Sequence, residues 1–141
     1  ALQVGGADTH RMSLTDSLML KDNHWAIMDG NIEDLMHDLR KQMSFTQQIE
    51  VECSDLPSAM EATELGADII MLDNVDSNSA RDRSKQIKLY YPKIIVEVSG
   101  GIDESNVVEF CCPNINVISL GCLTTRPKYI DLSMNVVQKS A

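Results

Sequence analysis

Short apolar runs alternate with longer amphipathic segments along almost the whole chain, and this alternation restricts the possible folds more than any other property of the sequence. The apolar runs have the length of β-strands, and polar residues, Gly or Pro flank each of them. They are Leu18–Lys21, Ile49–Glu52, Asp68–Leu72, Ile94–Val98 and Val117–Leu120. Strands that alternate with helices in this way predict an α/β fold with a parallel sheet.

Between the strands, apolar residues recur three and four positions apart, as they do along one face of a helix. Gly66 and Pro92 stand where the second and third helices should end. The expected helices lie within Ile32–Leu39, Leu56–Leu65, Ser79–Tyr91 and, as a short fourth one, Glu104–Phe110.

Polar residues follow the strands at their C-terminal ends. In a β/α barrel these ends converge on one mouth, whereas a doubly wound sheet gathers ligands at one crevice and leaves some strand ends unused. The pattern therefore favours a barrel. Five strands are too few to close one, and Ala1–His10 carry no helix start signal. We expect residues 1–141 to form a single incomplete barrel domain that lacks a preceding segment with its first strands.

The composition agrees with this fold and argues against several classes of partner. Aromatic residues make up 4% of the chain, so Ile, Val, Leu, Ala and eight Met must build the core, which suits parallel strands covered by helices. The net charge of −9, with no basic stripe, argues against binding to nucleic acid or to an anionic membrane. There is no signal peptide and no apolar run of about 18 residues, so we predict a cytoplasmic protein.

The four cysteines are not arranged as two C-x-x-C pairs, so a zinc site is not expected. They are Cys53, Cys111, Cys112 and Cys122. We predict reduced, partly buried thiols.

Three cations lie close together in the sequence. His10 and Arg11 follow a turn at Gly5-Gly6, and Lys21 ends the first strand. An arginine offers a planar fork and a lysine a point charge, so the three could bind a dianion. The alternative is a solvated turn with a lysine that reaches into water.

Two carboxylates, Glu52 and Asp73, end neighbouring strands. Such a pair suits sugar hydroxyls, a hard cation such as Mg²⁺ or an oxocarbenium-like centre. Glu50 points to the same side of its strand as Glu52, so one of the two should lie deeper in the barrel and pair with a cation there. The alternative is that both carboxylates form structural ion pairs.

Ser99, Gly100 and Gly101 follow the fourth strand, and Gly121 follows the fifth. Glycines let backbone N–H groups approach an anion, a helix N-terminus adds a favourable dipole, and barrels often bind phosphate after their last two strands. The alternative is that these glycines only form tight turns, which often contain the same residues. Together the three groups predict a ligand that carries a sugar phosphate beside a separate acidic substrate.

Six motifs, in the same order, resemble those of quinolinate phosphoribosyltransferases, and the eukaryotic branch is the most similar. The resemblance runs from Gly5 to about Ser133. The motifs are Gly5-Gly6-Ala7-Asp8-Thr9-His10-Arg11, Leu20-Lys21-Asp22-Asn23-His24, Ile49-Glu50-Val51-Glu52-Cys53, Met71-Leu72-Asp73-Asn74, Glu97-Val98-Ser99-Gly100-Gly101-Ile102 and Val117-Ile118-Ser119-Leu120-Gly121.

The resemblance implies transfer of phosphoribosyl from phosphoribosyl pyrophosphate to quinolinate, with release of pyrophosphate and CO₂, in the synthesis of NAD. By matched position, the cations His10, Arg11 and Lys21 would bind the quinolinate carboxylates and the neighbouring pyrophosphate. The carboxylates Glu52 and Asp73 would hold the ribose hydroxyls and the Mg²⁺-bound donor. The 5′-phosphate would be held by Ser99, Gly100, Gly101 and Gly121.

The family also has an N-terminal domain, an early barrel portion with further substrate-binding cations, and an active site at a dimer interface. The resemblance therefore implies that residues 1–141 lack the N-terminal domain and the first barrel strands. The first motif of the family often begins with a third glycine, and Val4 stands at that position here. Two other functions stay open from the sequence. One is a related barrel enzyme with another substrate, and the other is a non-catalytic fragment that binds phosphate ligands.

Overall fold

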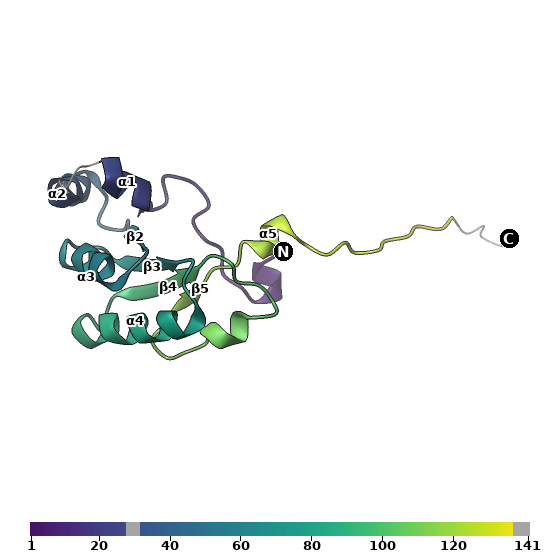
Figure 1. The fold of residues 1–141 in the computed structure, drawn as a ribbon. Helices are drawn as coiled ribbons and strands as arrows, with labels where there is room; N and C mark the ends of the chain where they lie inside the picture. The colour runs from purple at the N-terminus through teal and green to yellow at the C-terminus, as the bar shows by residue number, and fades with distance from the viewer. Residues whose placement is uncertain (28–31, 137–141) are drawn as a thin grey trace.

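The computed structural model describes residues 1–27 and 32–136, which form a five-stranded, fully parallel sheet (Figure 1). Neighbouring strands in the sheet are also neighbours along the chain, in the order β1-β2-β3-β4-β5. A doubly wound sheet would reverse this order at a switch point. The predicted α/β fold, part of a β/α barrel, is therefore confirmed. The strands are β1 (Leu18–Leu20), β2 (Ile49–Cys53), β3 (Ile69–Asp73), β4 (Ile95–Ser99) and β5 (Val117–Ile118).

The predicted helices are present, although several boundaries differ. α4 begins at Ser77, two residues early, because the side chain of Asp76 accepts hydrogen bonds from the N–H groups of Asn78 and Ser79. The fourth predicted helix is a short 3₁₀ turn, and a helix after β1 was not predicted. The helical segments are η1 (Gln3–Gly5), α1 (Asp22–Ile27), α2 (Ile32–Gln42), α3 (Leu56–Glu64), α4 (Ser77–Tyr90), η2 (Val107–Phe110) and α5 (Cys122–Thr125).

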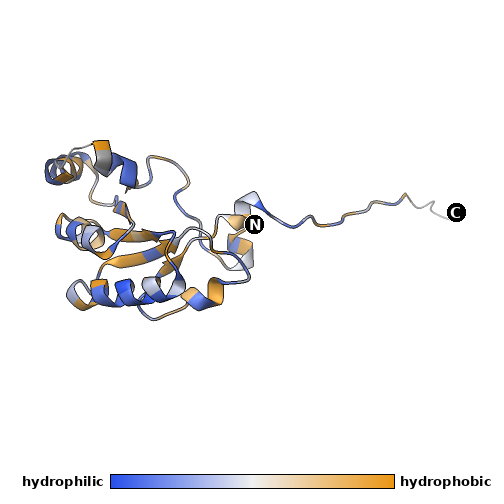
Figure 2. Ribbon diagram, in the orientation of Figure 1, coloured by the Kyte–Doolittle hydropathy of each residue, from blue (hydrophilic) through white to orange (hydrophobic). Residues whose placement is uncertain are grey.

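The core lies between the sheet and the helices that cover one of its faces. Alternate strand residues point to this face, and those that do are buried and apolar. The strands are accordingly coloured largely as hydrophobic (Figure 2). Small residues on the helices, including Ala59 and Ala62, let the helix backbone approach the sheet closely. The strand residues with no exposed surface are Ile49, Val51, Ile70, Leu72, Val96 and Val98. The polar residues of the strands are thereby left on the other face.

Replacement of Leu72 by alanine should lower the free energy of unfolding by about 2–5 kcal/mol, because the side chain is fully buried and its loss leaves a cavity. Urea denaturation of the full-length protein measures this change. Leu89→Ala is the matched control, since Leu89 is 74% exposed and its removal should cost less than about 0.5 kcal/mol. Equal losses for the two variants would contradict this placement of the core.

No disulfide joins the four cysteines, all of which lie in the described part of the chain. Cys53 is buried, and this burial raises the pKa of its thiol to about 12. Cys53 therefore stays protonated at neutral pH. Cys111 is exposed.

The segment that follows α5 runs away from the sheet as an extended chain (Figure 1). Its apolar side chains, among them Ile130, Leu132 and Met134, are exposed. Within residues 1–27 and 32–136, no helix is long and apolar enough to cross a membrane.

Candidate functional site

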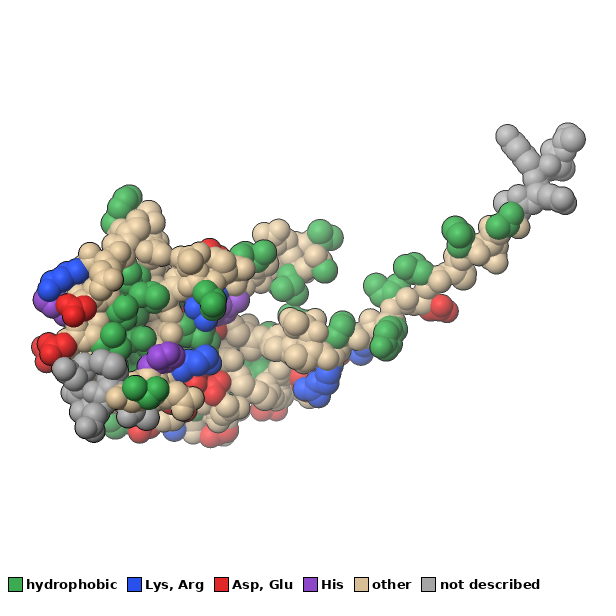
Figure 3. Space-filling model, turned by 90° about the horizontal axis from the view of Figure 1, so that it is seen from above, with side chains coloured by type: hydrophobic (Ala, Val, Ile, Leu, Met, Phe, Trp, Pro, Cys, Tyr) green, Lys and Arg blue, Asp and Glu red, His purple; other side chains and the backbone are tan. Residues whose placement is uncertain are grey.

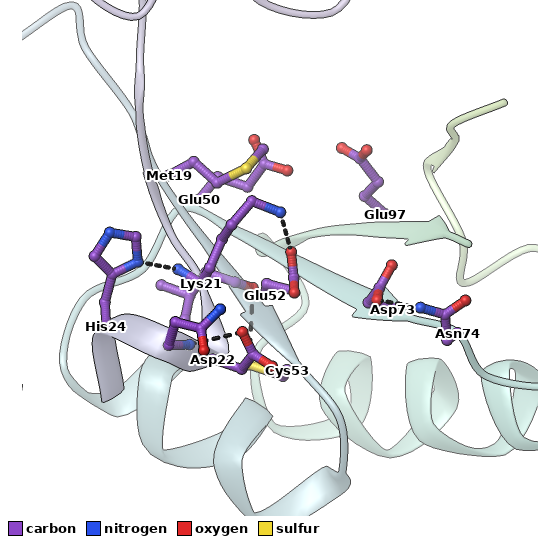
Figure 4. Close-up of polar contacts among 12 residues, drawn as sticks. Met19, Lys21, Asp22, His24, Glu50, Glu52, Cys53, Asp73, Asn74 and Glu97 are labelled. Carbon is purple, nitrogen blue, oxygen red and sulfur yellow. Dashed lines mark hydrogen bonds and ion pairs between the residues drawn. The ribbon is translucent and has the colours of Figure 1, made fainter. Parts of the chain in front are cut away.

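The face of the sheet opposite α3 and α4, which we call the open face, carries the polar strand residues. Because side chains alternate along a strand, Glu50 and Glu52 of β2 share this face with Glu97 of β4. The strand register places Asp73 of β3 beside Ser99 of β4. In Figure 4 these carboxylates rise from one side of the sheet while the helices lie on the other. Seen from above (Figure 3), histidine, basic and acidic side chains lie next to one another.

Lys21 and Glu52 form an ion pair at the C-terminal ends of β1 and β2. The Lys21 Nζ to Glu52 Oε2 distance is 2.7 Å, and the Glu52 side chain is only 12% exposed. The hydrogen bond that Lys21 donates to Glu52 raises the pKa of Lys21, so the lysine is charged at neutral pH. The sequence predicted separate roles for these two residues. The structure brings them into direct contact, which leaves the open side of the ammonium group for an anionic ligand.

His24 also helps to fix the position of Lys21. The backbone N–H of Lys21 donates to Nδ1 of His24 over 2.9 Å, at the start of α1 (Figure 4). No role was predicted for His24, although it ends the motif Leu20-Lys21-Asp22-Asn23-His24. A prediction that a helix begins at Asp22 would have indicated this contact. The side chain of the third residue of such a helix can reach back to the end of the preceding strand.

His10 lies over two buried carboxylates near the centre of the open face. Its Nε2 is 3.5 Å from Oε1 of Glu50 and 3.4 Å from Oε1 of Glu97. Burial, and then the charge of Glu97, raise the pKa of Glu50, while the hydroxyl of Ser119 donates to Glu97 over 2.5 Å. Glu50 is therefore the deeper of the two β2 carboxylates, and the imidazole of His10 lies beside it.

Glu97 was not among the predicted site residues, although a carboxylate inside the apolar run Ile94–Val98 was a signal that could have found it. Ligand atoms of His10, Glu50 and Glu97 all lie within 4.8 Å of one another, close enough to share one cation. The hydroxyl of Ser119 donates to Oε1 of Glu97, whereas Oε1 of Glu50 is buried and has no hydrogen-bond partner within the described chain. We refer to these three residues as the His10–Glu50–Glu97 cluster.

Arg11 is the cation of the site with the weakest contacts inside the chain. Its guanidinium donates to the carbonyl of Ser17 at 3.3 Å and lies 3.8 Å from the sulfur of Met19. Among the described residues, no carboxylate lies within salt-bridge distance of Arg11. The group therefore keeps its capacity to bind an acidic ligand.

The loops after β4 and β5 lie side by side, because these strands are paired and the N–H of Ser119 donates to the carbonyl of Val98. Gly100 and Gly101 have φ angles of 86° and 66°, which side chains rarely tolerate. Gly121 has an ordinary φ of −63° at the start of α5. The structure thus brings Ser99, Gly100, Gly101 and Gly121 to neighbouring loops at one edge of the sheet.

Comparison with known proteins identifies the family that the chain resembles. The profile of the family described as "Quinolinate phosphoribosyl transferase, C-terminal domain" matches residues 1–135. The chain is 43% identical over 137 residues to a carboxylating nicotinate-nucleotide pyrophosphorylase of Dictyostelium discoideum, covering 96% of this chain and 45% of the relative. The protein of that name from Homo sapiens is 40% identical over 138 residues, covering 98% and 46%.

Solved structures give the same result. The crystal structure of NadC from Streptococcus pyogenes superposes with a TM-score of 0.82 at 36% identity, covering 95% of this chain and 46% of that one. Eukaryotic proteins are among the most similar relatives, as predicted, and a probable homologue from the archaeon Methanocaldococcus jannaschii is 42% identical. The chain spans about half the length of the curated relatives it matches.

Proposed function

The chain belongs to the quinolinate phosphoribosyltransferase family, and on this basis we propose that the full-length protein transfers a phosphoribosyl group to quinolinate. The donor is phosphoribosyl pyrophosphate, and the products are nicotinate mononucleotide, pyrophosphate and CO₂. The observation that carries the proposal is the Lys21–Glu52 pair, which lies on the same face and at the same strand ends as Asp73 and the glycine loop.

Glu52 and Asp73 are the residues we assign to the ribose. Carboxylate oxygens accept hydrogen bonds from sugar hydroxyls, and two negative charges stabilise positive charge that develops at C1. Lys21 neutralises Glu52 in the absence of ligand. Its ammonium group can then stabilise the negative charge of the departing pyrophosphate, while Glu52 keeps one oxygen for a hydroxyl.

The loops after β4 and β5 are assigned to the 5′-phosphate. Ser99, Gly100 and Gly101 supply backbone N–H groups, and Gly121 supplies another from the adjacent loop. A chain with positive φ angles presents successive N–H groups to a bound anion. Asp73 and Ser99 are register partners at the C-terminal ends of β3 and β4. These neighbouring positions suit a ribose whose hydroxyls bind at one strand end and whose phosphate binds at the next.

Arg11 is the main residue we assign to the two carboxylates of quinolinate, since its guanidinium fork matches carboxylate geometry. His10 and Lys21 contribute less directly than the sequence suggested. One nitrogen of His10 faces the buried carboxylates, which leaves Nδ1 for the substrate, and Lys21 is shared with Glu52. Further cations would come from parts of the full-length protein outside this sequence.

We include Mg²⁺ in the proposal, bound mainly through the pyrophosphate of the donor. The residues fit this ion, because Glu52 and Asp73 offer the hard oxygen ligands that it prefers and both lie where the strands end. When bound, the ion supplies positive charge that stabilises the leaving pyrophosphate.

The reaction then depends on position and electrostatics. Departure of pyrophosphate makes C1 of the ribose oxocarbenium-like, and the pyridine nitrogen of quinolinate forms the new bond to C1. The positive ring nitrogen stabilises the electron pair left on the adjacent ring carbon when its carboxylate leaves as CO₂, and that carbon then takes up a proton from water to give the product. No covalent bond to the protein is needed, so the protein accelerates the reaction by holding both substrates in line.

We further propose that the full-length protein acts in the cytoplasm as a homodimer or higher homo-oligomer, with a site completed by an N-terminal domain and the first strands of the barrel. The open edges of β1 and β5 support a larger sheet, because unpaired strand edges are usually covered.

The full-length protein, given phosphoribosyl pyrophosphate, Mg²⁺ and quinolinate, should form nicotinate mononucleotide, pyrophosphate and CO₂ in equal amounts. Chromatography of the nucleotide and release of labelled CO₂ measure this. Lys21→Ala should lower turnover at least about tenfold, because loss of a charge-assisted contact costs about 1.5–3 kcal/mol. Turnover of another pyridine in place of quinolinate would favour the related barrel enzyme, and binding without any turnover would favour the non-catalytic alternative.

A further inference from the structure

Asn74, which follows β3, connects the two halves of the proposed donor site. Its side-chain amide donates to Oδ2 of Asp73 over 2.5 Å (Figure 4). Its backbone N–H donates to the carbonyl of Ser99 over 2.9 Å. One residue therefore holds the carboxylate assigned to the ribose and, at the same time, the first residue of the loop assigned to the phosphate.

The backbone of Asn74 is in an unusual conformation. Its φ of 51° lies in the left-handed region, and no other described residue apart from glycine has a positive φ. Asparagine tolerates this region better than most residues, because its short polar side chain can bond locally. Strained backbone of this kind persists where the surroundings fix it, often at functional sites.

Asn74 also packs against Gly100. A Cβ built on Gly100 would meet Cγ and the backbone nitrogen of Asn74, both at 2.7 Å, which is closer than real Cβ atoms come. The left-handed turn at Asn74 and the left-handed Gly100, with its φ of 86°, thus occupy adjoining space. A side chain at Gly100 would therefore have to displace Asn74.

We propose that Asn74 is a positioning residue that orients Asp73 toward the ribose and fixes the backbone of the phosphate loop. The amide performs the first task and the left-handed backbone the second. This inference rests on the proposed function, since it concerns the same site. It assigns to Asn74 no direct contact with the reacting atoms.

The two tasks can be separated by substitution. Asn74→Gly keeps the left-handed backbone but removes the amide, whereas Asn74→Asp keeps the shape but places a negative charge beside Asp73. Asn74→Ala removes the amide and also disfavours the left-handed backbone. Loss of an orienting partner of a functional carboxylate typically costs 10–100-fold.

Calorimetric titration of the full-length variants with ribose 5-phosphate and with inorganic phosphate tests both tasks. For Asn74→Gly and Asn74→Asp we expect affinity for ribose 5-phosphate to fall about tenfold, with phosphate affinity changed less than about threefold. Asn74→Ala should weaken both ligands. If Asn74→Gly binds ribose 5-phosphate as the unsubstituted protein does, or loses both ligands equally, the inference is wrong.

Turnover adds a second test. When Asp73 is already replaced by alanine, the additional change Asn74→Gly should not lower kcat further, because Asn74 acts through Asp73. Independent, multiplying losses would overturn the proposal. Gly66→Ala is the control for strain alone, since Gly66 has a φ of 96° with nothing near its Cβ position, at the opposite end of β3. It should lower thermal stability without changing ligand affinity.

The proposed reaction and this inference fail in different ways. If the unsubstituted protein binds ribose 5-phosphate but does not turn over quinolinate, the reaction is wrong, and the binding titrations still test Asn74. If turnover is as proposed and the Asn74 variants retain both kcat and ribose 5-phosphate affinity, only the role of Asn74 is wrong.

Discussion

Gly100→Val will weaken the binding of phosphoribosyl pyrophosphate by about 100-fold, while quinolinate affinity changes less than about threefold. The φ of 86° at Gly100 is strained for valine, and the added Cβ would lie 2.7 Å from the backbone nitrogen of Asn74. Because that neighbour is backbone, it cannot swing aside. The loop must change its path, and each residue forced from a compatible conformation costs about 1–3 kcal/mol, enough for the expected loss.

Calorimetric titration of the full-length protein with each ligand measures both affinities. Gly101→Ala is the matched control, because Gly101 also has a positive φ, of 66°, but has open space at its Cβ position. It should weaken donor binding less than Gly100→Val does. Equal losses of both ligands in the Gly100 variant would count against a dedicated phosphate site. If Gly100→Val does not fold, Gly100→Ala introduces the same contact with less bulk.

The positions of the strands could be predicted because each fully buried strand is a compact apolar run. β2, β3 and β4 lie within one residue of the predicted ranges Ile49–Glu52, Asp68–Leu72 and Ile94–Val98. Fully buried parallel strands carry this signal in their composition. β5 is shorter than predicted, because its register with β4 ends at Ile118.

Contacts between distant residues could not be predicted in the same way. The cluster of His10, Glu50 and Glu97 joins three separate segments, and only the sheet register places Glu97 on the face of Glu50. The sequence indicated that Glu50 or Glu52 would lie deeper, but not which one. The left-handed conformation of Asn74 was also unpredicted, since Asn occurs in many conformations and nothing in the local sequence requires this one.

The contacts of the three predicted cations also separate their roles. His10 faces two buried carboxylates and Lys21 is paired with Glu52, whereas Arg11 contacts only a carbonyl and a thioether within the described chain. A cation whose charge is already balanced contributes less to the choice of an anionic substrate than one whose charge is not. Selection of the diacid should therefore depend on Arg11 more than on either of the others.

Arg11→Ala should lower kcat/KM for quinolinate by about 100-fold in the full-length protein, because a bidentate, charge-assisted contact of about 3 kcal/mol is lost. Quinolinate carries two adjacent carboxylates and nicotinate one. A site built to bind the pair leaves a cation without its partner when the monoacid binds, so nicotinate should be a poor substrate before the substitution and change little after it. Steady-state kinetics with both acids, at saturating donor and Mg²⁺, measure the difference.

Two further variants identify the property of Arg11 that matters. Arg11→Lys should recover only part of the lost kcat/KM, since a point charge cannot reproduce the planar fork. Arg81→Ala removes a positive charge from α4, on the opposite face of the sheet, and should leave kcat/KM nearly unchanged, which excludes a general effect of net charge. If Arg11→Ala retained full turnover of quinolinate, Arg11 would not be the residue that selects the diacid. The selection would then have to come from cations outside this part of the protein, and a related barrel enzyme with another substrate would become the better interpretation.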